Sequence, residues 1–227
     1  MRRLWNYLRT WLIITRKRLF RLADTSKGED YTRFAIICAP RSGSTMLHTY
    51  LNSHSEILSH GEIIRIKLEQ GEEHVSIDEF VYMPMSKTIK AVGLKLFYEY
   101  QHKKGYDQVF EEVLSDNNIN IIHLKRKDLR KQYSSLKKAE KTGIWSSTLR
   151  QNKEDERMDI PDNEYKEYED RQKEMIQSIQ NRLQNHRVME VYYEDLVDDP
   201  KHVLDQIQDF IKVRKKPLFT LLQKQGS

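Results

Sequence analysis

The 227-residue sequence contains only one cysteine, Cys38. A single cysteine rules out an intrachain disulfide framework and a cysteine-based zinc site. Because Cys38 ends the apolar run 34–38, we expect it to be a small, buried hydrophobic residue.

The sequence also lacks a long hydrophobic run. Its most apolar N-terminal stretch is interrupted by Arg9 and Arg16, whereas a membrane-spanning helix needs ~20 consecutive apolar residues. The first three residues resemble the basic start of a signal peptide, but Arg9 breaks the apolar segment and no small-residue cleavage site follows. A cytoplasmic location is therefore the default prediction.

Neither sign of charge dominates. The net charge is +5, with 32% charged and 38% hydrophobic residues, which is typical of one soluble domain with a heavily charged surface. A modest positive charge suits an anionic ligand, a membrane surface or nucleic acid about equally, so it does not choose among these partners. We find no internal repeat.

Residues 1–30 form a separate unit, a basic amphipathic helix followed by a polar linker. Leucine and tryptophan residues recur at helical spacing over 1–23, between arginines and lysines, and 24–30 are polar. The helix could pack its apolar stripe on the main domain, lie on an anionic membrane surface, or serve as a targeting segment.

The main domain, residues 31–227, alternates strands and helices. Short apolar runs at 34–38, 91–98, 119–124 and 188–193 are typical of strands buried in a parallel sheet. Helical patterns follow at 46–51, 128–141, 165–183 and 203–211, the third after a charged segment that we expect to be a mobile loop. This alternation predicts a three-layer α/β sandwich with a mostly parallel central sheet.

The loop after the first strand has the chemistry of an anion site. It reads Pro40-Arg41-Ser42-Gly43-Ser44-Thr45 and leads into a helix, whose first N–H groups and dipole favour an oxyanion. Gly43 permits a close turn, Arg41 supplies a cation, and the three hydroxyl side chains add donors. An ordinary capped turn is the alternative.

The loop departs from a magnesium-dependent nucleotide site. A Walker A loop, G-x-x-x-x-G-K-[ST], would have lysine where Ser44 stands, and its first glycine is missing. No apolar strand ends in a metal-binding aspartate, since the third ends in Lys125-Arg126. These departures disfavour a kinase or ATPase.

Two segments resemble the PAPS (3′-phosphoadenosine-5′-phosphosulfate)-dependent sulfotransferase family. The loop 39–45 is similar to the family's 5′-phosphosulfate-binding loop, with Arg41 where many members have lysine. Arg126 with Ser134 eight residues later resembles the 3′-phosphate-binding element. An arginine at a strand end and a serine two helical turns into the next helix can converge on one phosphate.

Finer features resemble the bacterial trehalose sulfotransferase-like branch. They are Gly61-Glu62, the segment 134–145 and Tyr193-Glu194-Asp195-Leu196. The resemblance covers residues 33–225 and implies a P-loop-type α/β fold. Related enzymes often continue beyond the point where this sequence stops, so we expect the adenine side to be open.

The resemblance implies sulfuryl transfer from PAPS to a hydroxyl of a carbohydrate, glycolipid or small metabolite, without a metal. Arg41 and residues 42–45 would hold the phosphosulfate and stabilise the leaving phosphate, while Arg126 and Ser134 would bind the 3′-phosphate. Positioning and electrostatics should supply most of the rate, as in phosphoryl transfer.

The resemblance also places a catalytic glutamate at Glu62, with His60 as the second candidate base. Burial and charge should shift the pKa of Glu62, and a raised value would suit a general base; a surface or capping role is the alternative. Lys95, unexpected inside an apolar strand, needs a partner, either a bound sulfonate or a structural ion pair.

Some assignments stay open at the level of sequence. Trp145 could line the adenine or acceptor pocket or belong to the core, and Glu194 with Asp195 should fix a turn and a helix start. The rival functions are a P-loop-like nucleotide-binding protein or kinase, and a non-catalytic surface binder acting through residues 1–23. The expected partner is a small-molecule or glycan acceptor chosen by variable loops such as 63–87 and 146–165, with peripheral membrane contact through 1–23 and no nucleic acid.

Overall fold

The structure, a computed structural model, describes residues 27–145 and 160–220. The helix predicted over 1–23 and residues 146–159 of the variable loop predicted over 146–165 lie outside these ranges. The rest of that predicted loop is partly helical, because a helix begins at Asp162. The end of the predicted linker contains a short strand, β1 (Lys27–Gly28), which pairs antiparallel with β4 (Met85–Ser86). The domain boundary at residue 31 stays a prediction.

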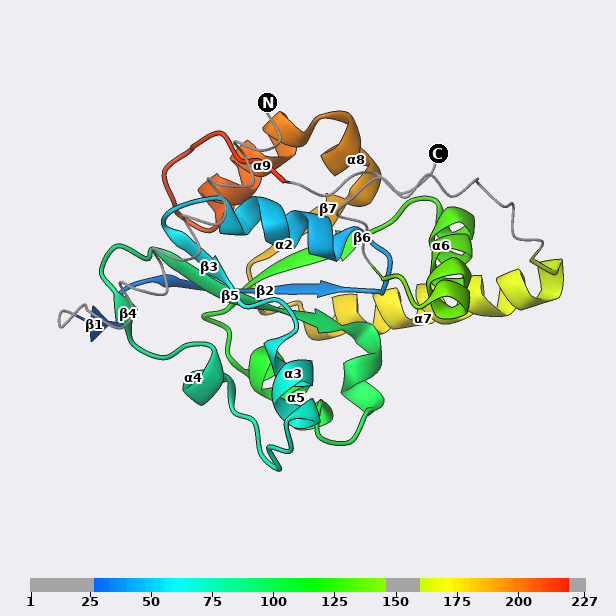
Figure 1. Cartoon of the computed structure of the whole chain (residues 1–227), viewed down its shortest axis with the longest axis horizontal. Helices are drawn as coiled ribbons and strands as arrows, with labels where there is room; N and C mark the ends of the chain where they lie inside the picture. Colours follow the sequence, from blue (N-terminus) through cyan, green and yellow to red (C-terminus); the bar gives the residue numbers. More distant parts are fainter. Residues whose placement is uncertain (1–26, 146–159, 221–227) are drawn as a thin grey trace.

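A five-stranded parallel sheet forms the centre of the molecule (Figure 1). Its strands, in spatial order, are β3 (Ile57–Ser59), β5 (Ala91–Phe97), β2 (Thr32–Cys38), β6 (Asn120–Lys125) and β7 (Val188–Tyr192). Every neighbouring pair in this sheet is parallel. The predicted α/β fold with a mostly parallel sheet is therefore confirmed.

Helices cover both faces of the sheet. Figure 1 shows α2 (Ser44–Asn52), α8 (Tyr193–Asp198) and α9 (Pro200–Phe210) on one face. On the other lie α3 (Ile63–Glu69), α4 (Ile77–Phe80), α5 (Asp107–Ser115) and α7 (Asp162–Arg182). The helix α6 (Leu129–Thr142) stands beyond the carboxyl end of the strands, and the 3₁₀-helix η1 (Tyr98–His102) follows β5.

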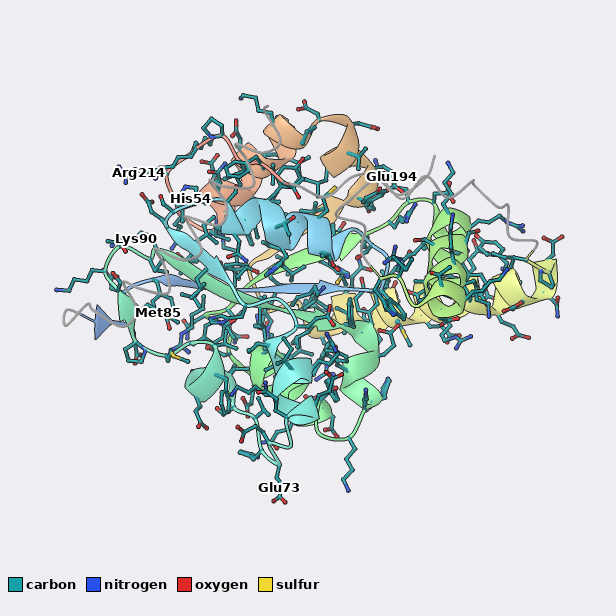
Figure 2. All side chains as sticks on the ribbon, in the orientation of Figure 1. His54, Glu73, Met85, Lys90, Glu194 and Arg214 are labelled. Carbon is teal, nitrogen blue, oxygen red and sulfur yellow. The ribbon has the colours of Figure 1, made fainter. Side chains whose placement is uncertain are left out.

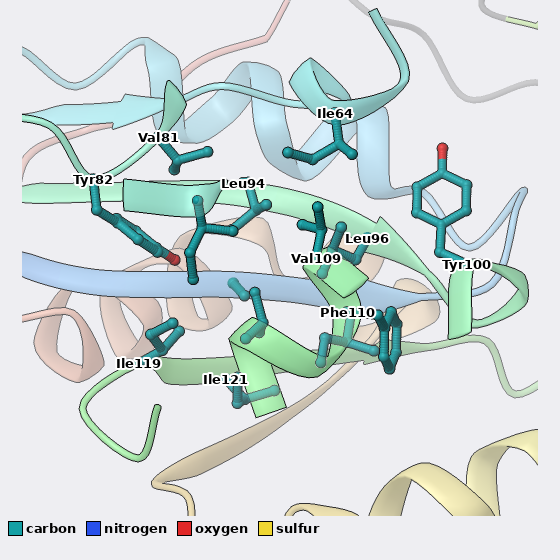
Figure 3. Close-up of a cluster of buried hydrophobic side chains, with 14 of the residues drawn as sticks. Ile64, Val81, Tyr82, Leu94, Leu96, Tyr100, Val109, Phe110, Ile119 and Ile121 are labelled. Carbon is teal, nitrogen blue, oxygen red and sulfur yellow. The ribbon is translucent and has the colours of Figure 1, made fainter. Parts of the chain in front are cut away.

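The two faces of β2 enter two separate hydrophobic clusters because alternate residues of a strand point to opposite sides. Ala35 and Ile37 join the cluster under α3, α5 and α7, part of which is drawn in Figure 3. Phe34, Ile36 and Cys38 join the cluster under α2 and α9. Cys38 is fully buried, as predicted. A strand buried on both faces at the centre of the sheet gives the loop that follows it a rigid base.

Among the helices formed by residues 27–145 and 160–220, none is both long enough and apolar enough to cross a membrane.

Candidate active site

The predicted anion loop lies at the carboxyl end of the central strand, between β2 and α2. Arg41 and Gly43 both adopt left-handed backbone conformations, with φ of 63° and 84°. Left-handed residues alternating along a turn direct backbone N–H groups into a concavity that can bind an anion. The first hydrogen bond of α2 runs from the N–H of Leu47 to the carbonyl of Gly43, 3.0 Å. Gly43 is the N-cap residue and has no side chain that could cap the helix. Among the described residues, no backbone carbonyl accepts from the N–H groups of residues 44–46, so these groups can donate to a ligand.

Gly43 is required for two reasons, its positive φ and its contact with the ring of Tyr193. A Cβ atom added to Gly43 would lie 2.3 Å from Cδ2 of Tyr193. The side chain of Tyr193, at the start of α8, thus packs directly under the loop. A close approach of this kind is available only to glycine.

We expect Gly43→Ala to destabilise the protein and distort the loop. A left-handed alanine costs ~1–2 kcal/mol, and the overlap with Tyr193 should add ~1–3 kcal/mol. Gly71→Ala is the matched control, because Gly71 also has positive φ (91°) but has nothing within 4 Å of the added Cβ. Urea unfolding should show the larger loss for Gly43→Ala; equal losses would contradict the role assigned to Tyr193.

The side chain of Arg41 extends from the loop toward α6. Its Nε donates a hydrogen bond to Oγ of Ser135, 2.9 Å, and its NH1 donates to the carbonyl of Trp145. Burial, together with the positive charge of Arg126, lowers the pKa of Arg41. Two partly buried arginines at close range repel each other, and an anion between or beside them would relieve that repulsion.

Arg126 follows β6 and reaches the same loop. Its NH1 donates to the carbonyl of Arg41, 3.1 Å, and its guanidinium lies 4.6 Å from the ring centroid of Tyr193. Its Nε is buried and has no hydrogen-bond partner among the described residues; the nearest carboxylate oxygen, on Glu194, is 3.8 Å away. A buried guanidinium N–H with no acceptor, on an arginine beside a phosphate-type loop, fits a ligand that carries a second phosphate.

Glu194 and Asp195 hold the turn that carries Arg126, as the sequence predicted. The carboxylate of Glu194, labelled in Figure 2, accepts hydrogen bonds from the backbone N–H of Lys127 (2.9 Å) and of Asp128 (3.2 Å). Asp195 pairs with the ammonium of Lys127 at 2.5 Å. Asp128 then caps α6 by accepting from the N–H of Lys131, 2.8 Å.

Two α6 residues that the sequence analysis missed contact the loop. Gln132, almost fully buried, donates from Nε2 to the carbonyl of Pro40, 2.8 Å, and Ser135 binds Arg41. Ser134, the predicted 3′-phosphate ligand, is partly buried on the same helix, about 100° round the axis from Ser135. The spacing i, i+3 places Gln132 and Ser135 on one face. That spacing was the available signal in the sequence.

Lys95, also predicted for the site, has a protein partner. Its ammonium lies 2.7 Å from Oε1 of Glu62 and 3.5 Å from Oγ1 of Thr45, the last residue of the predicted loop. Lys95 is 3% exposed, so the charge is compensated inside the protein. Of the two readings left open, the ion pair is the one seen, and it connects Glu62 to the anion loop.

The pKa of Glu62 is lowered, whereas a raised pKa would make Glu62 a stronger general base. Burial alone would raise this pKa, but Lys95 and then Arg65, whose Nε lies 2.9 Å from Oε2, lower it below its usual range. Glu62 is therefore ionised at neutral pH and able to accept a proton, although it is a weaker base than a carboxylate with a raised pKa.

Trp145 and His60 are the other two candidates from the sequence. Trp145, left open between pocket and core, has 53% of its surface exposed, so it is not a core residue. His60 is partly buried, and its backbone N–H donates to the carbonyl of Gly93, 2.8 Å. Among the residues described, no three histidine, cysteine or acidic side chains are grouped so that they could hold a metal ion.

Comparison with known proteins gives concordant matches. Residues 117–217 match the model of the sulfotransferase family. Nodulation protein H of Rhizobium tropici is 25% identical over 192 residues, which are 78% of this chain and 74% of that protein. The solved sulfotransferase domain from the curacin biosynthetic pathway covers 82% of this chain and 75% of its own, with a TM-score of 0.51 and 18% identity, a likeness of fold. The trehalose-specific branch stays a prediction.

Proposed function

We propose that this chain, whose residues 117–217 match the sulfotransferase family model and which is 25% identical to nodulation protein H over 192 residues, transfers the sulfuryl group of PAPS to a hydroxyl group of a carbohydrate, glycolipid or small metabolite. The observation that supports this donor is the meeting of two cationic elements at one edge of the sheet. Arg126 donates to the backbone of Arg41, and both belong to segments that suit phosphate. A nucleotide with phosphates at its 5′ and 3′ positions offers an anion to each element.

We assign these residues to two groups. Arg41 and the backbone of Ser42 to Thr45 would bind the phosphosulfate, and Arg126 with Ser134 would bind the 3′-phosphate. PAPS supplies an activated sulfuryl group whose phosphate leaving group gains charge as the bond breaks. Fixed guanidinium and N–H donors directed at that phosphate stabilise the developing charge without reorganising.

Lys95 and Glu62 connect the donor loop to the acceptor. Lys95 touches both Thr45 and Glu62, so it adds positive charge beside the transferred group and fixes the carboxylate. Glu62 accepts the proton of the acceptor hydroxyl as the hydroxyl oxygen attacks the sulfur atom of PAPS. The negative charge on Glu62 is stabilised by Arg65 on the side away from Lys95.

Calorimetric titration with PAP (3′,5′-phosphoadenosine) tests the donor assignment. We expect the full chain to bind PAP in the presence of EDTA, and ATP with magnesium at least tenfold more weakly, because a charge-assisted site for the 3′-phosphate contributes binding energy of this size. Equal or tighter binding of ATP with magnesium would favour a kinase-like protein. A variant without residues 1–23 should bind PAP equally, whereas a surface binder acting through those residues would lose its partner.

A further inference from the structure

Two side chains outside the donor site, Glu99 and Gln172, each have a buried oxygen atom. Glu99 is in η1 and Gln172 is in α7. Within residues 27–145 and 160–220, Oε2 of Glu99 and Oε1 of Gln172 are buried and have no hydrogen-bond partner. Gln172 is 3% exposed. Unsatisfied buried acceptors cost folding free energy, so two of them near an active site call for a ligand that donates to them.

Strand register places Glu99 beside the anion loop. Cys38 of β2 pairs with Phe97 of β5, so Pro40 and Glu99 each come two residues after the same paired position on adjacent strands. Adjacent strands lie ~4.8 Å apart. Glu99 therefore leaves the sheet at the same carboxyl edge as the loop, and η1 packs against α7 there.

The surroundings of Glu99 differ from those of Glu62. Burial raises the pKa of Glu99, and the backbone N–H of Glu99 itself and the positive charge of Arg171 offset this only in part. Burial also raises the pKa of Tyr168, one turn before Gln172 on α7, and the charge of Glu99 adds to that shift. Glu99 thus lies near α7 in a partly buried environment, where a hydrogen bond from an uncharged hydroxyl group is strengthened.

We propose that Glu99 and Gln172 form a subsite for the acceptor, which binds a neutral molecule carrying several hydroxyl groups. Two acceptor oxygens need two donors, and a polyhydroxylated molecule supplies both while presenting a third hydroxyl for transfer. An aromatic alcohol with one hydroxyl would leave both oxygens unpaired, and sites of this type discriminate strongly against such analogues. This inference rests on the proposed sulfotransferase function and specifies its acceptor.

The test uses Glu99→Met and Gln172→Met, which remove the acceptor oxygens and keep a side chain of similar length. Trehalose, N-acetylglucosamine and myo-inositol are the probes, with 2-naphthol as the aromatic comparison. For the best of the three polyols, each substitution should raise KM about tenfold, as expected for one lost hydrogen bond, and change kcat less. PAP affinity should stay within about twofold.

Thermal stability separates a binding role from a structural one. Removing an acceptor that has no partner should leave Tm unchanged or raise it, because nothing in the fold is satisfied by that oxygen. A fall in Tm as large as that of a core substitution would overturn the inference. Glu167→Met and Gln177→Met, on the exposed side of α7, are the matched controls and should alter neither KM nor Tm.

The outcomes distinguish this inference from the proposed function. If the wild type binds PAP but none of the three polyols, by saturation-transfer NMR on the PAP-loaded protein, the subsite assignment is wrong and the donor assignment stands. Transfer to 2-naphthol in preference to every polyol, or an unchanged polyol KM in both variants, also contradicts it. Failure of the wild type to bind PAP contradicts the proposed function itself.

Discussion

Glu62→Gln should lower the rate of sulfuryl transfer by about 10²–10⁴-fold, the range for loss of a general base, with PAP affinity unchanged within about twofold. Glutamine keeps an oxygen for Lys95 but cannot take up the hydroxyl proton. The informative result is a lower transfer rate with unchanged PAP affinity. We expect it because Lys95 lies between Glu62 and Thr45 of the anion loop. Titration with PAP and initial rates of transfer from labelled PAPS measure the two quantities.

The pH dependence gives this first prediction a second signature. Lys95 and Arg65 hold the pKa of Glu62 below its ordinary 4.5, so its contribution to folding is present above the pKa of the unfolded chain. It is lost as the pH falls through the lower folded value. The stability difference between wild type and Glu62→Gln should therefore be largest near neutrality and shrink in acid.

Two controls accompany Glu62→Gln. Glu69→Gln removes the other partner of Arg65, at 2.9 Å on the exposed side of α3, and should leave transfer unchanged. His60→Gln tests the second candidate base. Retained turnover in Glu62→Gln together with loss in His60→Gln would move the proton-accepting role to His60.

Arg126→Ala should weaken PAP binding by about 100-fold, since charged hydrogen bonds contribute ~1.5–3 kcal/mol each. The same substitution should affect 5′-AMP far less, because 5′-AMP has no 3′-phosphate. The preference for PAP over 5′-AMP should therefore almost disappear. Calorimetry with both nucleotides on both proteins measures this preference directly.

Arg130→Ala is the matched control for Arg126→Ala. Arg130 is four residues further along, on the exposed surface of α6, and pairs with Asp162 at 2.6 Å. Its loss should leave both affinities unchanged. An unchanged PAP affinity in Arg126→Ala, or an equal loss for PAP and 5′-AMP, would contradict the assignment of Arg126 to the 3′-phosphate.

The sequence predicted the main strands and long helices because each is a continuous apolar run or a clear helical repeat. The sequence did not predict the shorter elements. β3 has only three residues, too few for a periodic signal, and α3 and α4 lie within 63–87, a segment read as a variable loop. The helix α5 buries Val109, Phe110 and Val113 on one face, a pattern weakened by the charged and polar residues between them.

For the site, sequence motifs identified the segments but not the pairings between them. The partner of Lys95 lies 33 positions earlier in the chain, and only the parallel pairing of β3 with β5 brings the two regions together. The lowered pKa of Glu62 follows from that pairing. The ring that packs against Gly43 belongs to Tyr193, 150 positions later in the chain. No local sequence pattern predicts a contact between residues so far apart.

The ring of Tyr193 has one more consequence. It packs against Gly43 on the anion loop and lies 4.6 Å from the guanidinium of Arg126, so one rigid ring supports both cationic elements where Arg126 donates to the carbonyl of Arg41. The distance between them is thereby set before any ligand arrives. A nucleotide whose second phosphate is attached at the neighbouring 2′ oxygen has the same charge but a different span. Such a nucleotide should bind more weakly than PAP, because the ring of Tyr193 fixes the separation of the two cationic elements.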